Sequence, residues 1–101
     1  MAVAFIQEIR FEPGDHSTTN YDVVVERLGD ISPDGLLIHT AGFDDEAGVF
    51  RIFDVWESQA QAEQFIQGQL MPIIEELMAA DPGAAAPQRE AFYELHHVID
   101  A

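Results

Sequence analysis

The residues of this chain best suited to chemistry are histidines and carboxylates in apolar surroundings. His39 follows Ile38 within an apolar stretch of the sequence. The imidazole of a histidine titrates near neutral pH, so His39 can serve there as a general acid or base. The alternative is a partly buried histidine that hydrogen-bonds to a neighbour and shapes a cavity. We take His39 as the first catalytic candidate and keep both roles open.

Asp54 is the second such residue, because it lies among the apolar residues 52–55. A carboxylate in apolar surroundings costs free energy unless it is paired. An ion pair with a cation of a neighbouring strand, Arg10, Arg51 or Arg89, is the structural alternative. In the functional alternative, Asp54 is the polar anchor of a ligand in an apolar cavity.

Three aromatic residues are candidates for binding a ligand. Trp56 and Phe50 alternate onto one face of the same predicted strand, where flat rings can form the walls of a pocket for an aromatic substrate. Both residues also suit a packed core. Tyr21 can donate a hydrogen bond to a ligand, or lie at the edge of the core with its hydroxyl group in water.

His96 and His97 are neighbours on the last predicted strand, so their side chains are expected on opposite faces of the sheet. We take His96 as the second catalytic candidate. If the strands of His39 and His96 are the two edges of a four-stranded sheet, they lie about 14 Å apart, at three strand spacings. That separation is too large for shared metal ligation, and no metal site is expected.

Several classes of chemistry lack the residues they need. The sequence has no cysteine, which excludes disulfides, thiolate catalysis and cysteine-bound metals. It also lacks the glycine-rich loops of nucleotide sites, the serine-hydrolase elbow and the H-x-x-x-H spacing of zinc proteases. We therefore expect no bound cofactor.

Composition limits the partners of the chain. Its 101 residues include 19 Asp and Glu but only 4 Lys and Arg, for a net charge of −15. Nucleic acids and anionic membranes are unlikely partners, because binding either needs clustered cations. No apolar run approaches the ~18 residues of a membrane span, and residues 1–10 lack the pattern of a signal peptide. We expect a cytoplasmic protein with one domain, residues 1–101.

The elements that must position these residues follow the order strand, helix, strand, strand, helix, strand. Apolar spacing at helical intervals predicts a first helix around residues 21–28 and a second over residues 58–78. Gly68 and Pro72 interrupt the second, which predicts a kink or two short helices. Residues 81–87 read as a flexible connector. The predicted strands are residues 3–11, 36–43, 49–56 and 89–99.

The predicted strands are apolar on both faces, which bears on assembly. Val49, Phe53 and Val55 lie on one face of the third strand, and Phe50 and Ile52 lie on the other. Two helices can cover only one face of a four-stranded sheet. We expect a second copy of the chain to cover the other face, which predicts a homodimer.

The pattern as a whole resembles the dimeric α+β barrel superfamily, and within it the antibiotic-biosynthesis-monooxygenase-type domains, most closely their uncharacterised actinobacterial members. The resemblance implies an α+β, ferredoxin-like fold with a four-stranded antiparallel sheet, two helical regions on one face and dimerisation through the other. The residues that carry it are Gly35-Leu36-Leu37-Ile38-His39, Asp54-Val55-Trp56-Glu57-Ser58, Phe65, Leu70-Met71-Pro72 and Leu95-His96.

The resemblance leaves the activity open, because one fold hosts many functions. In the haem-degrading branch a histidine binds the iron at the position that Glu75 occupies here, so haem chemistry is not expected. The first hypothesis is a dimer that binds a small hydrophobic or aromatic molecule without catalysis. The alternative is a cofactor-independent monooxygenase that uses His39 as its base. An apolar cavity beside His39 and Trp56 would favour the enzyme, and a sealed core there would favour the binding protein.

Overall fold

The computed structural model describes residues 2–30, 32–80 and 87–99. Four strands and a set of helices alternate in the order expected from the sequence. The connector predicted at residues 81–87 lies, except for its last residue, outside the described residues. The elements are β1 (Val3–Arg10), α1 (Thr19–Leu28), β2 (Leu36–Asp44), β3 (Val49–Trp56), α2 (Gln59–Phe65), the π-helix η1 (Ile66–Leu70), α3 (Met71–Ala80) and β4 (Arg89–Glu94).

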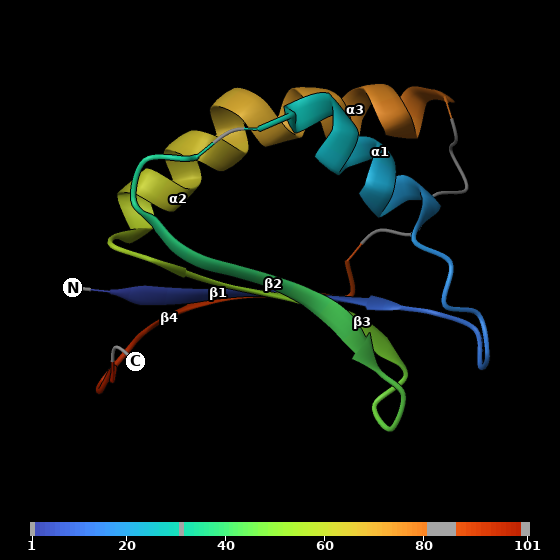
Figure 1. The fold of residues 1–101 in the computed structure, drawn as a ribbon, viewed down its shortest axis with the longest axis horizontal. Coiled ribbons are helices and arrows are strands. Elements are labelled where there is room, and N and C mark those ends of the chain that lie inside the picture. Colours follow the sequence, from blue (N-terminus) through green and yellow to red (C-terminus); the bar gives the residue numbers. More distant parts are fainter. Residues whose placement is uncertain (1, 31, 81–86, 100–101) are drawn as a thin grey trace.

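The strands form one antiparallel sheet in the order β2-β3-β1-β4, so β2 and β4 are its edges. All of the helices lie over the same face of this sheet, and the opposite face is bare (Figure 1). This is the ferredoxin-like α+β arrangement that the sequence predicts. The positions of β2 and β4 at opposite edges agree with the expected separation of His39 from the last strand.

The strand register fixes which side chains face the helices. Trp56 lies opposite Val3, and two residues back along β3 Asp54 lies opposite Phe5 and His39. Because successive residues of a strand alternate between faces, all five side chains share one face. Trp56 packs against Ala62 of α2, which identifies this as the face under the helices.

The second helical region is interrupted, as predicted. Ser58 caps α2 by accepting a hydrogen bond from the backbone N–H of Gln61. The π-helix η1 then separates α2 from α3, and Pro72 is the second residue of α3. Because Pro72 has no N–H to offer the carbonyl of Gly68, an ordinary α-helical bond is missing at this point. The wider turn of a π-helix lies directly before it.

The core is concentrated at one end of the molecule. Val3, Phe5, Trp56 and Ala62 are buried and pack together beneath α2. By contrast, α1 and α3 contain no buried residue. The helical layer is therefore closely packed on the sheet at the α2 end and only loosely seated elsewhere.

The last strand is shorter than predicted. β4 ends at Glu94, which pairs with Val3 at the start of β1. Leu95 still donates a backbone hydrogen bond to the carbonyl of Ala2. The chain after Leu95 extends past the start of β1 and, within the described residues, has no neighbouring strand to pair with. The prediction of strand structure as far as residue 99 was therefore wrong.

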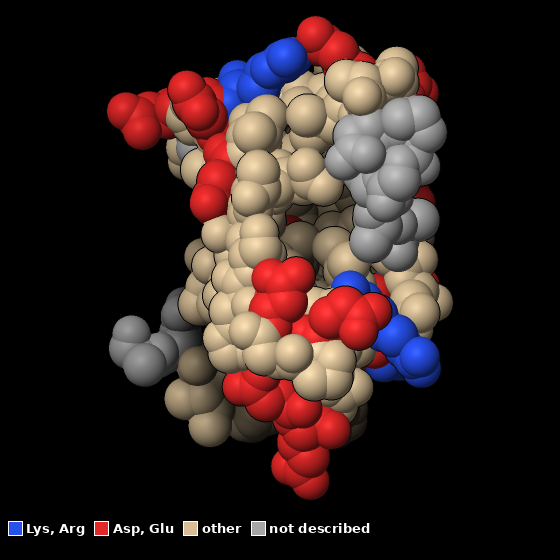
Figure 2. Space-filling model, turned by 90° about the vertical axis from the view of Figure 1, so that its right-hand side faces the viewer, with Lys and Arg blue, Asp and Glu red and all other residues tan. Residues whose placement is uncertain are grey.

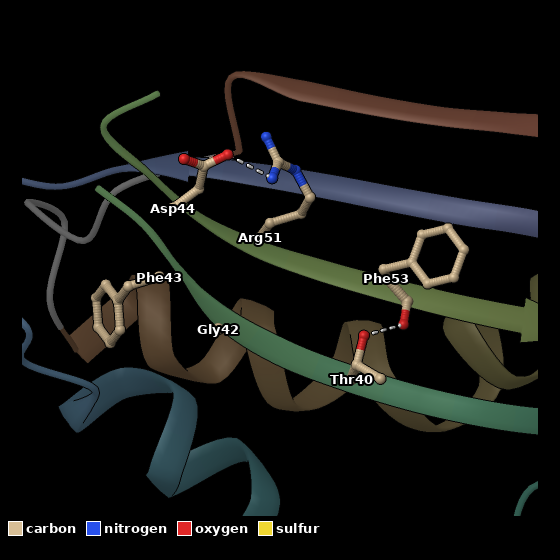
Figure 3. A pocket seen from close by; sticks show the side chains of 6 residues that line it. All are labelled: Thr40, Gly42, Phe43, Asp44, Arg51 and Phe53. Carbon is tan, nitrogen blue, oxygen red and sulfur yellow. Dashed lines mark hydrogen bonds and ion pairs between the residues drawn. The ribbon is translucent and has the colours of Figure 1, made fainter. Parts of the chain in front are cut away.

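The bare face of the sheet carries both apolar side chains and a small ionic network. Ile38 and Tyr93 are about half exposed on it, at 51% and 44%. Arg51 pairs there with Glu8 of β1 at 2.6 Å and with Asp44 of β2 at 2.8 Å. A shallow cavity of about 180 Å³ lies beside this network, lined by Thr40, Gly42, Phe43, Asp44, Arg51 and Phe53 (Figure 3).

None of the helices in the described residues combines the length and the apolar character needed to span a lipid bilayer.

Candidate functional site

Three polar side chains form a hydrogen-bonded chain under the helices. Asp54 Oδ1 lies 2.6 Å from Nδ1 of His39, and the hydroxyl oxygen of Tyr21 lies 2.7 Å from Nε2 of the same ring. His39 and Asp54 are direct neighbours across the β2–β3 ladder, whereas Tyr21 reaches them from α1. We call this arrangement the Asp54–His39–Tyr21 chain.

With Asp54 ionised and His39 neutral, the three groups have one consistent arrangement of protons. An ionised carboxylate can only accept a hydrogen bond, so Nδ1 of His39 carries a hydrogen and donates it to Asp54. In the neutral imidazole Nε2 is then the acceptor, and the Tyr21 hydroxyl donates to it. In this state Nε2 is the basic nitrogen of His39, and it is hydrogen-bonded to the Tyr21 hydroxyl.

An irregularity of β2 determines where the imidazole points. The register of β2 with β3 shifts between Leu36 and Ile38, so that Leu37 is an extra residue. Bulges of this kind redirect the side chains that follow, and a slip of one residue moves a side chain to the other face. His39 consequently faces the helices, together with Ala41 as the sequence predicts.

The surroundings tune both titratable rings. The hydrogen bond with Asp54 raises the pKa of His39 above its usual value, and partial burial opposes this effect. Burial raises the pKa of the Tyr21 hydroxyl, with further contributions from the negative charges of Asp54 and Asp22. His39 is thus a stronger base than a free histidine, and Tyr21 remains a neutral donor.

An aromatic wall continues from this chain toward the β2–β3 hairpin. The ring of Phe50 lies edge-on to Tyr21, with 5.3 Å between ring centroids, and 4.8 Å from Phe43. His16, from the loop before α1, stacks on Phe43 at 4.2 Å and bonds to Asp45. Sequence reasoning identified Phe50 and Tyr21 but missed Phe43. The signal was its position four residues from His39, which places both on one face of β2.

The space above these residues is an open cleft. The side chain of His39 remains 41% exposed although it faces the helices, whereas that of Asp54 beside it is 12% exposed. Figure 2 shows the molecule hollowed between its helical layer, at the top, and the sheet below. The imidazole of His39 is therefore accessible from outside, and the carboxylate of Asp54 is largely shielded.

The structure separates Trp56 from this cleft. Trp56 is 1% exposed and belongs to the core beneath α2, where its ring lies 5.7 Å from that of Phe65. The indole N–H is buried and has no hydrogen-bond partner among the described residues. Of the two expected pocket walls, Phe50 lies against Tyr21, whereas Trp56 fills the core.

Asp54 does not pair with an arginine in this structure, contrary to the structural alternative drawn from the sequence. Its partner is His39. Arg51 lies three residues before Asp54 on β3, an odd interval that places it on the opposite face. There it pairs with Glu8 and Asp44 instead.

The structure does not bring His96 to His39. Because β4 ends at Glu94, His96 and His97 follow the strand and are exposed, so the expectation that the sheet directs them to opposite faces was wrong. β4 also forms the sheet edge opposite to β2. Within the described ranges, no group of three His, Asp or Glu residues is arranged to hold a metal ion.

Comparison with known proteins gives a likeness in structure only. No protein-family model matches the sequence, and no curated protein matches it significantly. Three solved structures align with nearly the whole chain. One, assigned to the antibiotic biosynthesis monooxygenases of Chloroflexus aurantiacus, shares 18% identity at a TM-score of 0.66, covering 99% of this chain and 98% of the other.

The other two structures give the same result. A variant of SnoaB, a cofactor-independent oxygenase from Streptomyces nogalater, shares 13% identity at a TM-score of 0.66, covering 99% of this chain and 98% of its own. A further protein assigned to the antibiotic biosynthesis monooxygenases, from Deinococcus radiodurans, shares 15% identity at a TM-score of 0.67, covering 100% and 98%. The chain thus has the ferredoxin-like α+β fold of antibiotic biosynthesis monooxygenase structures along nearly its whole length.

Proposed function

We propose that this protein binds a small planar aromatic molecule in the cleft between α1, α3 and the sheet, and that His39 removes a proton from it. The observation that carries this proposal is the Asp54–His39 pair, in which a shielded carboxylate supports a partly exposed imidazole. A carboxylate behind a histidine holds the ring in one tautomer and stabilises the cation formed when it takes up a proton. That is the arrangement a general base requires.

The reaction proposed is oxygenation without a cofactor, an activity that one of the structural neighbours is named for. An electron-rich substrate gives a proton to His39, and its anion passes electrons to dioxygen as a carbon–oxygen bond forms. The resulting peroxide anion takes the proton back from His39, and the hydroperoxide so formed loses water to give a carbonyl group. Overall, a methylene group and one O₂ become a carbonyl group and one H₂O, so the substrate supplies the electrons that reduce the second oxygen atom.

The second candidate function is binding without catalysis. The sealed core around Trp56 favours it, because the end of the domain that holds the only tryptophan offers no room for a ligand. Both functions use the same cleft. They differ in whether the proton taken by His39 leads to a reaction.

We further propose that the chain acts as a homodimer joined through the bare face of the sheet. Apolar side chains lie half exposed there, notably Ile38 and Tyr93. Exposed apolar surface of this kind is typical of an interface between proteins. The Arg51 network on the same face satisfies its own charges within one chain, so a second copy can cover it without leaving a cation unpaired.

The proposal on activity is tested by oxygen consumption. Purified protein is mixed with an anthrone or a quinol, and oxygen uptake is compared for the wild type, His39→Ala and the matched control His97→Ala. We expect the wild type and the control to consume oxygen, and His39→Ala to be slower by about 100-fold or more. Equal rates in all three proteins would contradict the role of His39, and uptake no faster than in buffer would favour binding without catalysis.

A further inference from the structure

We propose that Tyr21 stands in for the hydroxyl group of the ligand, and so selects ligands that carry a hydroxyl on an aromatic ring. This inference rests on the proposed cleft and base and assigns them a substrate class. In the ligand-free protein, the position that a ligand hydroxyl would take at Nε2 of His39 is held by the protein's own phenol. A ligand must replace that phenol to reach the base.

The geometry leaves one acceptor for which the two hydroxyls compete. Nδ1 of His39 is engaged by Asp54 at 2.6 Å, so Nε2 is the remaining nitrogen of the ring. The Tyr21 oxygen lies 2.7 Å from it, and the two rings are nearly parallel, at 3°. This is the hydrogen bond that a phenol makes with an imidazole base, formed within the chain.

Tyr21 is held in place by few other contacts. No residue of α1 is buried, and Tyr21 itself is only partly so. Its ring touches Phe50 edge-on, and α1 is tied to α3 by an ion pair between Arg27 and Glu76. In this proposal, rotation of the Tyr21 side chain frees Nε2.

The exchange discriminates between ligands by their chemistry. A phenol or enol replaces the Tyr21 hydroxyl with an equivalent donor, so the hydrogen bond to His39 is conserved. An aryl ether has no donor, so displacing Tyr21 would leave Nε2 without a partner, which is costly in a partly buried site. The ether therefore binds beside Tyr21 and leaves its hydrogen bond to His39 in place. The cleft should therefore prefer a ring hydroxyl to the matching methyl ether.

The test uses 2-naphthol and 2-methoxynaphthalene as probes, with dissociation constants measured by titration calorimetry or by NMR. The proteins are the wild type, Tyr21→Phe and the matched control Tyr93→Phe, whose tyrosine lies on the bare face of the sheet. We expect wild type and control to prefer 2-naphthol. Tyr21→Phe should bind 2-naphthol about 5-fold tighter, because the competing hydrogen bond is gone, while its affinity for the ether changes less than 2-fold.

Three results would overturn the inference. Weaker binding of 2-naphthol by Tyr21→Phe would make Tyr21 a direct partner of the ligand, and an equal change for both probes would indicate a steric effect only. Failure of Tyr21→Phe to bind 2-naphthol would exclude the competition altogether. The test measures binding and does not depend on oxygen uptake, so the selectivity can be confirmed even if the protein has no oxygenase activity. If His39→Ala binds 2-naphthol as tightly as the wild type does, His39 is not part of the binding site and the proposed function is refuted as well.

Discussion

His39 and Asp54 face one another across the β2–β3 ladder, and their side chains meet at 2.6 Å on the face of the sheet that the helices cover. Each of the two side chains stabilises the other. The imidazole satisfies a carboxylate that would otherwise be costly in its shielded position, and the carboxylate fixes the tautomer of the imidazole. The imidazole side chain is 41% exposed and the carboxylate side chain 12%, so a shielded acceptor supports a base that lies nearer the surface.

Replacing Asp54 with Asn should weaken His39 as a base. The amide removes the negative charge whose hydrogen bond raises the pKa of His39, so we expect this pKa to fall in Asp54→Asn. The proposed oxygenation should slow by about 100-fold or more. NMR titration of the His39 ring measures the pKa directly. Asp45→Asn, at the exposed hairpin, is the matched control, and an unchanged pKa in Asp54→Asn would contradict the pairing.

The Asp54–His39 pair should also make stability depend on pH near neutrality. The pKa of His39 is raised in the folded protein, so the folded state binds its proton more tightly than the unfolded chain does. The resulting stabilisation is complete below the unfolded pKa, near 6.5, and is lost as pH rises through the higher folded value. Melting temperatures from pH 5.5 to 8.5 should show this decline in the wild type and a smaller one in His39→Gln.

The ionic network on the bare face should respond to acid in the opposite direction. Hydrogen bonds with Arg51 lower the pKa of Glu8 and of Asp44 below 4.5 and 3.8, respectively. Their stabilisation is present above those values and is lost as pH falls through the lower folded ones. Arg51→Met should remove it, so that the melting temperatures of variant and wild type converge as pH falls toward 3. A constant difference between them would show that packing, and not charge, is what Arg51 contributes.

The core under α2 should depend on Trp56 more than on any residue of the cleft. Truncating a buried tryptophan to alanine leaves a large cavity, and we expect Trp56→Ala to lower the free energy of unfolding by about 3–5 kcal/mol. Phe50→Ala, at the half-buried cleft wall, should cost clearly less. Urea denaturation followed by circular dichroism compares the two, and a larger loss for Phe50→Ala would place the core elsewhere.

Dimerisation through the bare face predicts an unusual dependence on salt. Each chain carries a net charge of −15, so two chains repel one another, and added salt screens that repulsion. The dimer should therefore become tighter as ionic strength rises. Analytical ultracentrifugation at micromolar concentration measures this, with Ile38→Glu expected to favour the monomer. A wild-type monomer at all salt concentrations would refute the dimer.

The order of elements could be predicted from apolar periodicity and turn residues, which specify helices and strands locally, whereas the sheet topology came from the resemblance to the dimeric α+β barrel superfamily. The end of β4 could not, since it depends on where the neighbouring strand β1 begins. The interrupted helix was signalled by Gly68 and Pro72, but its form as a π-helix was not.

The sequence identified the residues of the candidate site but not the hydrogen bonds between them. His39, Asp54 and Tyr21 were each identified, yet Asp54 was expected beside an arginine. The pairing with His39 depends on the strand register, and the register depends on the extra residue at Leu37. The link to Tyr21 joins a helix and an edge strand that are distant in sequence. Such contacts follow from tertiary packing, which no local pattern encodes.

The π-helix η1 makes the orientation of α3 depend on the number of residues between α2 and α3. Hydrogen bonds in η1 span five residues instead of four, so this turn holds one residue more than an α-helix would. Deleting Gly68 would let α2 and α3 merge into one regular helix, and everything after it would turn by about 100° about the helix axis. The one extra residue in η1 therefore sets the rotation of α3 about the helix axis relative to α2. That rotation determines which side chains of α3 face inward, while α2 keeps its contacts with the buried core.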